Sequence, residues 1–238
     1  TNPGMIFDGP GTIVVANRIA TTNGTLTKGG TGTLVLSGDN TFAGAININA
    51  GVVRVGHVNA FNTAALGALV TIADGATLEF VGGVNMSNAA ISAIGLGAGG
   101  QGAIYVASGN VDYAGLITVQ GAGTTRIKVD AGATLTFNSS TNSIRPANTN
   151  VSRTLNLNVA GTLNIAGVIA ISAANNRTLP VVKDGPGTVN YRNAHTYTGN
   201  TTVSDGILRL DFANATPTAN LILAGNNVTI NGGTLHFA

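Results

Sequence analysis

The sequence predicts an all-β protein, a parallel β-helix (β-solenoid) in which short strands stack turn upon turn. Three observations lead to this fold class: a composition that disfavours helices, an internal repeat, and turn glycines at nearly regular intervals. A single coil cannot bury its apolar face alone, whereas stacked coils share one core, so stability grows with the number of coils.

The composition of the 238-residue chain excludes several classes of protein. Charged residues make up 8% and hydrophobic residues 44%, which argues against intrinsic disorder, because disordered chains combine low hydrophobicity with high charge. Glycine alone accounts for 34 residues, and Gly, Asn and Thr are poor helix formers. The chain has no cysteine, so we expect neither a disulfide nor a thiolate metal site.

The distribution of charge and hydropathy argues against nucleic acid and membrane partners. The net charge is +2, and the eleven Lys and Arg residues are scattered rather than clustered, so we expect no nucleic-acid binding. No apolar stretch reaches the about 18 residues of a transmembrane helix, so we expect no membrane insertion. The chain begins without an initiator Met or a signal peptide, which we interpret as a processed product or an excised segment.

A long internal repeat links two distant parts of the chain. Residues 28–55 align without a gap with residues 183–210. Eight aligned pairs are identical: Lys28/Lys183, Gly30/Gly185, Gly32/Gly187, Thr33/Thr188, Thr41/Thr196, Gly44/Gly199, Gly51/Gly206 and Arg54/Arg209. The two copies should therefore adopt the same local structure.

A shorter unit recurs between and after these copies, and it combines two β-prone runs with a turn of Asp, Asn, Ala and Gly. It occurs at 70–80, 127–137, 157–165 and 228–237. Its turn glycines and those of the long repeat are Gly51, Gly75, Gly132, Gly161, Gly206 and Gly232. Their usual spacing suits one coil, which predicts a single solenoid domain, 1–238, of roughly ten rungs and about 45 Å.

Two stretches interrupt this rhythm. Residues 82–103 are rich in Gly and Ala, and residues 138–153 are polar. We interpret both as loops that leave the solenoid, with a short helix near 87–94. Loops of this kind are where repeat proteins commonly carry their binding specificity.

The first copy of the long repeat resembles a known repeat family. The residues that carry the resemblance are Gly30, Gly32, Thr33, Leu34, Leu36, Gly38, Asn40, Phe42, Gly44, Ala50, Gly51 and Val55. They resemble the autotransporter-associated β-strand repeat of bacterial type V passenger domains, from which Asn190, Tyr191 and His195 of the second copy depart. The resemblance implies a right-handed parallel β-helix outside the cell or on a bacterial cell surface. It implies no activity, because adhesins, surface-layer-like proteins and the stalks of enzymes share this scaffold.

The acidic residues show no catalytic or metal-binding motif. Five of the nine lie one or two residues before a turn glycine, where a carboxylate bonds the turn backbone: Asp8, Asp74, Asp130, Asp184 and Asp205. Two GGxG runs resemble a calcium-binding repeat, but Leu34 and Ile104 stand where that repeat needs Asp. We therefore predict no catalytic residue, no metal and no cofactor. Carboxylates that converge from successive turns remain the alternative.

The histidines and two aligned arginines are interpreted as surface residues. His195 aligns with Asn40, and His236 aligns with different residue types in its sister units. Such interchange is typical of outward-facing positions. The aligned pair Arg54 and Arg209 is expected to line one outer face, with a weak contact to an anionic glycan as the alternative to simple solvation.

The most direct functional interpretation is a structural or adhesive rod, as a stalk segment or fibre subunit, without enzymatic activity. Terminal rungs carry unpaired strand edges, so end-to-end self-association is the expected partnership. The predicted assembly ends are Met5, Ile6, Phe7, Leu235 and Phe237. Two alternatives stay open: a module that binds a glycan or cell surface through the two loops, and a polysaccharide-active enzyme.

Overall fold

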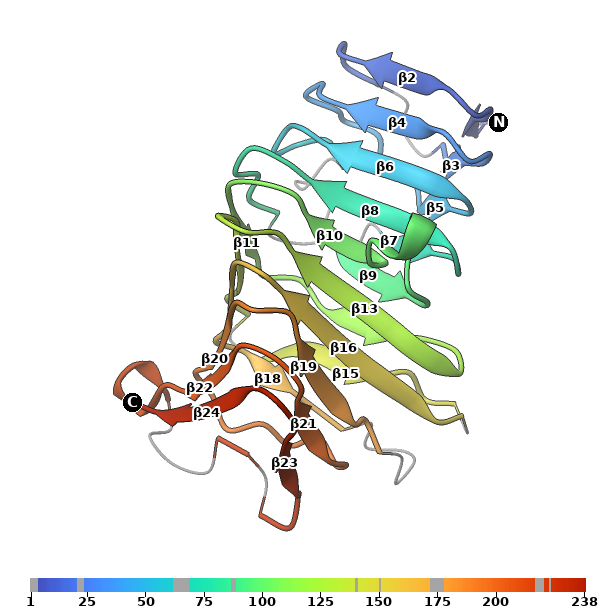
Figure 1. Cartoon of the computed structure of the whole chain (residues 1–238). Helices are drawn as coiled ribbons and strands as arrows, with labels where there is room; N and C mark the ends of the chain where they lie inside the picture. The colour runs from blue at the N-terminus through green and yellow to red at the C-terminus, as the bar shows by residue number, and fades with distance from the viewer. Residues whose placement is uncertain are drawn as a thin grey trace.

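A computed structural model shows a β-solenoid built from three parallel sheets (Figure 1). It describes residues 4–20, 24–61, 69–86, 89–139, 141–149, 151–171, 178–216, 221–222 and 224–238. These residues contain 24 strands and two short 3-10 helices, η1 (Ala98–Gly100) and η2 (Phe212–Asn214). The strand pairs that join successive turns are all parallel, which confirms the predicted fold class.

The strands of the three sheets follow one another in chain order along the stack. Sheet 1 contains β1 (Met5–Phe7), β3 (Leu26–Lys28), β5 (Ile46–Ile48), β7 (Leu69–Ile72), β9 (Ala90–Ala93), β12 (Ile117–Val119), β15 (Asn142–Pro146) and β18 (Val168–Ile169). Sheet 2 contains β2 (Thr12–Val15), β4 (Thr33–Leu36), β6 (Gly51–Val55), β8 (Ala76–Phe80), β10 (Ile104–Val106), β13 (Gly123–Val129), β16 (Arg153–Val159), β19 (Val181–Asp184), β21 (Thr201–Val203) and β23 (Val228–Ile230). Sheet 3 contains β11 (Asn110–Tyr113), β14 (Thr134–Phe137), β17 (Thr162–Ile165), β20 (Thr188–Tyr191), β22 (Ile207–Leu210) and β24 (Thr234–Phe237).

The solenoid has about eight turns, close to the roughly ten rungs that the sequence predicts. Sheet 2 runs through the whole described stack, sheet 3 begins only at β11, and sheet 1 ends at β18. Residues paired in adjacent turns of sheet 2 are as close as 19 positions (Thr33 with Val52) and as far as 30 (Ile127 with Leu157). The length of a turn therefore varies mostly through its connections.

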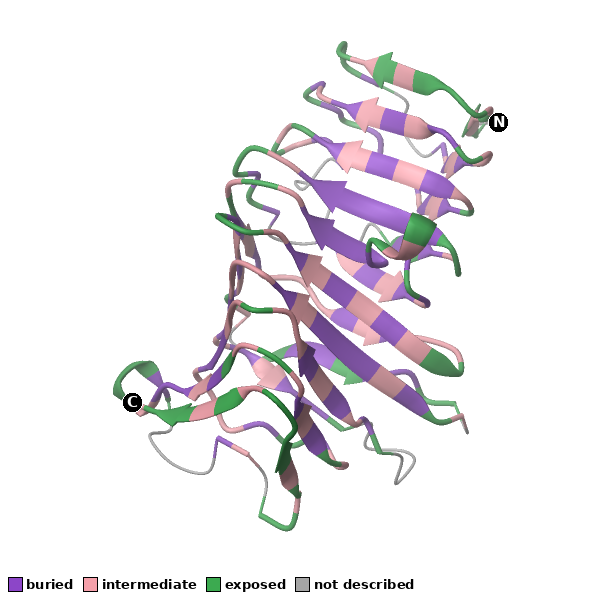
Figure 2. Ribbon diagram, in the orientation of Figure 1, coloured by how far each residue is buried: buried purple, intermediate pink, exposed green. Residues whose placement is uncertain are grey.

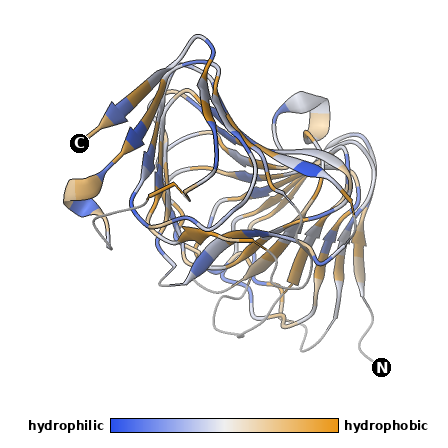
Figure 3. Cartoon of the chain, turned by 90° about the horizontal axis from the view of Figure 1, so that it is seen from below, coloured by the Kyte–Doolittle hydropathy of each residue, from blue (hydrophilic) through white to orange (hydrophobic). Residues whose placement is uncertain are grey.

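The core consists of aliphatic columns that run along the stack, one side chain from each turn. In sheet 1 one column is fully buried: Leu26, Ile46, Val70, Ile91, Ile117, Ile144 and Ile169. Alternate residues of each strand point inward, because successive side chains of a strand leave opposite faces of a sheet. Figure 2 shows this alternation of buried and more exposed positions, and Figure 3 shows the sheets enclosing the interior along the stack.

Each of the two stretches predicted to be a loop contains a strand of the solenoid, so that interpretation was wrong for residues 90–93 and 142–146. Residues 90–93 form β9 and residues 142–146 form β15 of sheet 1, where Ile91 and Ile144 fill the buried column. The short helix expected near 87–94 is replaced by that strand, and residues 87 and 88 lie outside the described residues. In each strand one large apolar residue fills the column, and the small or polar residues around it conceal this pattern in the sequence.

Within 82–103, the connection between β9 and β10 leaves the sheets. It folds back over the outer face of sheet 2, where the Ala98 N–H donates to Thr77 Oγ1 (2.8 Å) and this hydroxyl donates to Gly102 O (2.8 Å). Both faces of β8 and β10 are consequently buried (Figure 2).

Corner glycines are required where one turn lies directly on the next. Gly51 has φ +66°, and a Cβ built there would lie 2.3 Å from Gly32 O of the preceding turn. Gly206 in the second copy has φ +62°, and its Cβ would lie 2.4 Å from Gly187 O. Both positions therefore exclude a side chain for conformational and steric reasons.

We predict that Gly51→Ala destabilises the protein far more than Gly75→Ala. Gly75 has φ +76° but open space around its Cβ position, so its replacement costs only the left-handed strain of about 1–2 kcal/mol. Gly51→Ala adds a clash with backbone that cannot move without separating two turns. Urea denaturation of both variants measures the difference, and equal losses would contradict the proposed steric role.

Candidate functional site

The two copies of the long repeat occupy different sides of the solenoid. The first copy supplies β3 and β5 to sheet 1 and β4 and β6 to sheet 2. The second copy supplies β19 and β21 to sheet 2 and β20 and β22 to sheet 3. The same corner motif thus stands at the junction of sheets 1 and 2 in one copy and of sheets 2 and 3 in the other. The repeat encodes two stacked corners, and it does not depend on which sheets they join.

Each repeat corner is held by a lysine whose ammonium group lies among backbone carbonyls. Lys28 is 1% exposed and stands in an inward column between Phe7 and Ile48. Its Nζ donates to Gly29 O, to Gly30 O (2.9 Å) and to Ala50 O of the next turn (3.4 Å). Burial lowers the pKa of Lys28, and the nearby Asp8 carboxylate opposes that shift.

The second copy repeats this arrangement. Lys183 is fully buried in a column of sheet 2 between Leu157 and Val203. Its Nζ donates to Asp184 O (3.2 Å), Gly185 O (2.6 Å) and Asp205 O of the next turn (3.0 Å). Desolvation again lowers the pKa, with Asp205 and Asp184 opposing it.

Arg153 makes a third clamp of the same kind at a corner outside the repeat. It is 3% exposed, and its guanidinium donates to Ala147 O (2.6 Å), Thr149 Oγ1 and Gly121 O of the preceding turn (3.2 Å). Sequence reasoning missed all three clamps, because charged residues are usually assigned to the surface. The signal was the identity of Lys28 and Lys183 at the start of both copies.

A buried polar side chain also bonds the backbone of a neighbouring turn in each copy. Asn40 is 1% exposed; its Oδ1 accepts from the Ile19 N–H (2.8 Å) and its Nδ2 donates to Ala60 O (2.8 Å). His195, also 1% exposed, accepts from the Ile169 N–H through Nδ1 (3.1 Å). The prediction that His195 lies at the surface was therefore wrong, whereas His236 is exposed as predicted. The interchange of Asn and His reflects a shared acceptor role rather than solvent tolerance.

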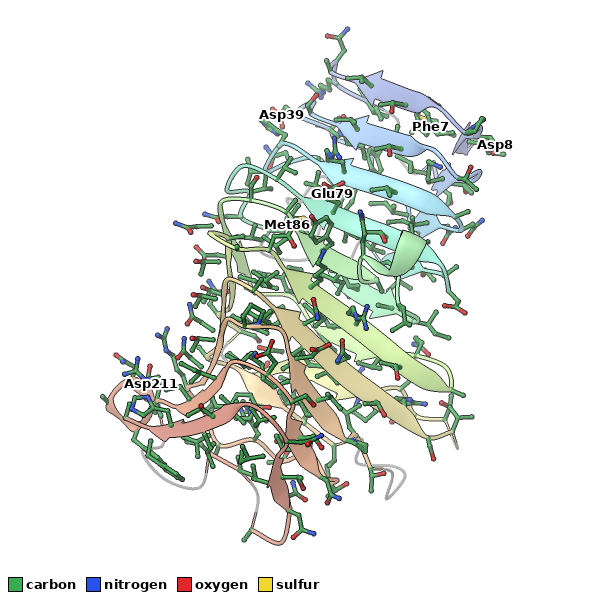
Figure 4. The ribbon with its side chains drawn as sticks, viewed as in Figure 1. Phe7, Asp8, Asp39, Glu79, Met86 and Asp211 are labelled. Carbon is green, nitrogen blue, oxygen red and sulfur yellow. The ribbon has the colours of Figure 1, made fainter. Side chains whose placement is uncertain are left out.

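The outer face of sheet 2 carries a column of paired polar side chains. Arg54 Nε lies 3.0 Å from Glu79 Oε2, and Glu79 is largely buried (Figure 4). Further along, Tyr105 Oη donates to Asp130, whose other oxygen lies 3.2 Å from Lys128 Nζ. These side chains pair with one another through hydrogen bonds and ion pairs. The column shows no nucleophile beside a general base among its described residues.

Arg209 does not share a face with Arg54, which corrects the prediction that the aligned pair lines one outer face. Arg209 lies in β22 of sheet 3, because the second copy is displaced by one side of the solenoid. Its NH2 group lies 3.9 Å from Asp211, a buried carboxylate that also accepts from Arg192 Nε (2.8 Å). Asp211 is labelled near the C-terminal end in Figure 4.

The residues predicted to form assembly ends lie in the terminal strands at opposite ends of the stack (Figures 1 and 4). Met5 and Phe7 pair with Leu26 and Lys28, so they face inward but are only partly covered. Ile6 points outward and is 75% exposed.

At the opposite end, Leu235 and Phe237 continue the inward columns of sheet 3. Leu235 pairs with Leu208, and Phe237 pairs with Leu210. Phe237 is 64% exposed because the described residues place no further turn over it. Phe237 also stacks against Phe212 of η2, with ring centroids 6.5 Å apart.

Two surface pockets lie on the described part of the solenoid. The larger, of about 360 Å³, lies at the junction of sheets 1 and 2 and is lined by Asp74, Ile94, Gly95, Leu96, Gly97, Ala122, Gly123 and Thr124. The smaller, of about 160 Å³, is lined by Asn85, Met86, Asp112, Ala114 and Asn138. The described residues hold no group of three or more His, Cys, Asp or Glu side chains that could bind a metal. Nor do they include a helix with the length and apolarity to cross a membrane.

We predict that Lys28→Met lowers the free energy of unfolding by about 2 kcal/mol, because Met preserves the side-chain length but leaves buried corner carbonyls without a charged donor. Lys128→Met is the matched control, since Lys128 is paired on the outer face with a half-exposed Asp130 and should cost less than about 1 kcal/mol. Urea denaturation at pH 7 compares the two. A loss for Lys28→Met no larger than the control's would contradict the clamp.

Comparison with known proteins supports the repeat assignment. A family model described as passenger-associated-transport-repeat matches residues 26–55 and 181–210, which contain the two copies that the solenoid displays. Searches of curated proteins and of solved structures gave no significant match. The chain therefore carries two passenger-associated-transport repeats on a parallel β-solenoid, and in this it is similar to autotransporter passenger repeat proteins.

Proposed function

We propose that the protein is a rod-like structural segment of a bacterial surface or secreted protein, and that its ends associate with other copies. The observation that carries the proposal is sheet 2, which runs through the whole described stack and whose inward apolar side chains continue to its first and last described strands. The repeat family supports the location, since passenger repeats belong to exported proteins.

The last described turn supports association because its inward apolar side chains are exposed. Ile230 pairs with the fully buried Val203 yet is 46% exposed. Together with Phe237, it presents an apolar end surface flanked by the unpaired edges of β23 and β24. Such edges are templates for pairing with another strand.

The order of the strands also favours stacking of one copy on another. The last turn supplies β23 to sheet 2 and β24 to sheet 3, and the first turn supplies β1 to sheet 1 and β2 to sheet 2. If a second copy stacks on the end that carries β24, its β1 falls on the side of sheet 1, and its β2 lies against β23 of sheet 2. This contact is heterologous and can repeat without closing, which produces filaments.

Electron microscopy across a concentration series tests the proposal. We expect filaments whose axial repeat equals one rod length, and we expect Phe237→Glu to abolish them, because it places a charge in the apolar contact. Leu69→Glu is the control, since Leu69 is an exposed apolar residue on the side of the rod. Single dispersed rods at every concentration would contradict end-to-end association.

A second candidate function, binding of a glycan or cell-surface sugar, is favoured by the larger pocket. That pocket exists because the corner between β9 and β10 is long, whereas the corners above and below it are tight. Its volume lies within the range of small-molecule sites, and Asp74 offers a carboxylate beside the apolar Leu96.

A glycan array followed by titration calorimetry tests this candidate. Leu96→Arg should fill the pocket and abolish binding of any glycan found, whereas Val58→Arg, at an exposed apolar residue outside the pocket, should not. Binding that survives Leu96→Arg would place the glycan site elsewhere.

A further inference from the structure

The two repeat copies contact the backbone of the preceding turn through different side chains, Asn40 in the first copy and His195 in the second. In the first copy, Asn40 accepts a backbone N–H from Ile19 of the preceding turn and donates to Ala60 O of the following turn. In the second copy, His195 keeps the acceptor half of this bridge through the Ile169 N–H. Its other ring nitrogen, Nε2, is buried and has no hydrogen-bond partner among the described residues.

The backbone around the two side chains is equivalent, so the comparison is direct. The Thr41 N–H donates to Ile19 O (2.9 Å), and the Thr196 N–H donates to Ile169 O (3.0 Å). The main-chain N–H of Asn40 donates to Asn59 O, and that of His195 donates to Leu221 O. Each residue therefore links three successive turns at matching places, Asn40 through its side chain on both sides and His195 through its ring on one side and its main-chain N–H on the other.

The geometry fixes His195 in its neutral form. Because the Ile169 N–H donates to Nδ1, that nitrogen must be unprotonated and the ring proton must sit on Nε2. A second proton on Nδ1 would face the Ile169 N–H donor to donor and break the contact with β18. Burial lowers the pKa of His195 to about 3.

The groups that face His195 offer no charge to stabilise an imidazolium. β20 contributes Tyr191, whose ring packs edge-on at 4.2 Å between centroids, and Tyr197 of the same connection lies at 6.2 Å. The pKa values of both phenols are raised mainly by burial, so both are neutral at physiological pH. β18 and residues 221–222 contribute only apolar side chains.

The charged neighbours in sequence are already engaged. Arg192 is a cation bound to Asp211, and Lys183 is bound to carbonyls at its corner. Burial works against ionisation of Asp211, but hydrogen bonds from Asn214 and Arg192 outweigh it, and the pKa of Asp211 lies below its usual value. Acidification from pH 7 to pH 5 therefore leaves this carboxylate ionised and acts on the histidine.

We propose that His195 is an acid-sensitive latch: its protonation releases the connection between β20 and β21 from β18 and so loosens the turns formed by β21 to β24, while the turns around Asn40 stay closed. The sign follows from linkage, because the open state binds a proton with the ordinary affinity of histidine and the closed state does not. The closed state is thus fully favoured above about pH 6.5 and loses stability as the pH falls below it. From pH 7 to pH 5 the equilibrium constant for opening should rise about 25-fold.

Hydrogen–deuterium exchange on the full chain at pH 7 and pH 5, corrected for the intrinsic pH dependence of exchange, tests the latch. We expect faster exchange at pH 5 in β21 to β24 and at the Ile169 amide, and little change in β3 to β6. An equal change in both regions, or no change in either, would overturn the proposal. This comparison uses the wild-type chain and needs no variant.

Two reciprocal variants separate the latch from general acid sensitivity. His195→Asn copies the side chain of the first repeat, so it should keep the acceptor and abolish the difference between pH 7 and pH 5. Asn40→His should move the acid response to β3 to β6. A response in β21 to β24 that persists in His195→Asn, or fails to appear at β3 to β6 in a folded Asn40→His protein, would contradict the role assigned to the imidazole.

Discussion

The corner at which one turn lies on the next is the constraint on which the rest of this solenoid depends. Strands in a parallel sheet are spaced by about 4.8 Å, and at the two repeat corners the backbones of successive turns come together with no room for a side chain. At Gly51 a Cβ would lie 2.3 Å from Gly32 O. Carbonyls of several peptide groups converge at the same place, and buried acceptors must be satisfied. Three buried cations donate hydrogen bonds to these carbonyls, and each of them reaches carbonyls of two turns: Lys28, Lys183 and Arg153.

A cation held by carbonyls, without a carboxylate partner, suits this position. An ion pair would need a second buried side chain, for which the corner has no space. Several carbonyl dipoles instead share the charge of one ammonium group, and hydrogen bonds to charged groups are stronger than neutral ones. The long aliphatic stem of lysine packs in the inward column, as Lys183 does between Leu157 and Val203. The corner therefore tolerates an interior charge that the rest of the core would not.

The periodic features of the fold could be predicted from the sequence. The features that depend on contacts between turns could not. The glycine spacing and the 28–55/183–210 alignment predicted a parallel solenoid, because both reflect the repeated coil. The loop interpretation of 82–103 failed at residues 90–93, where Ile91 fills the buried column of sheet 1. His195 was misplaced because alignment reveals that two residues are equivalent but not which way they face. The sequence also did not predict that the second copy lies in sheets 2 and 3 rather than in sheets 1 and 2. An alignment of two copies does not show which sheets each copy joins.

The low charge of the chain follows from the same parallel stacking. In an in-register stack each outward residue faces its equivalents about 4.8 Å above and below, and two like charges at that distance in water repel by about 1 kcal/mol. Charges that do occur on the outside alternate in sign or lie beside neutral partners, as with Arg54 and Glu79. The remaining positions favour residues that both donate and accept. On sheet 3, Asn190 donates to Asn164, and Asn164 donates to Thr136, so three turns are joined by one polar ladder. A composition with 8% charged residues is therefore a consequence of stacking as much as of environment.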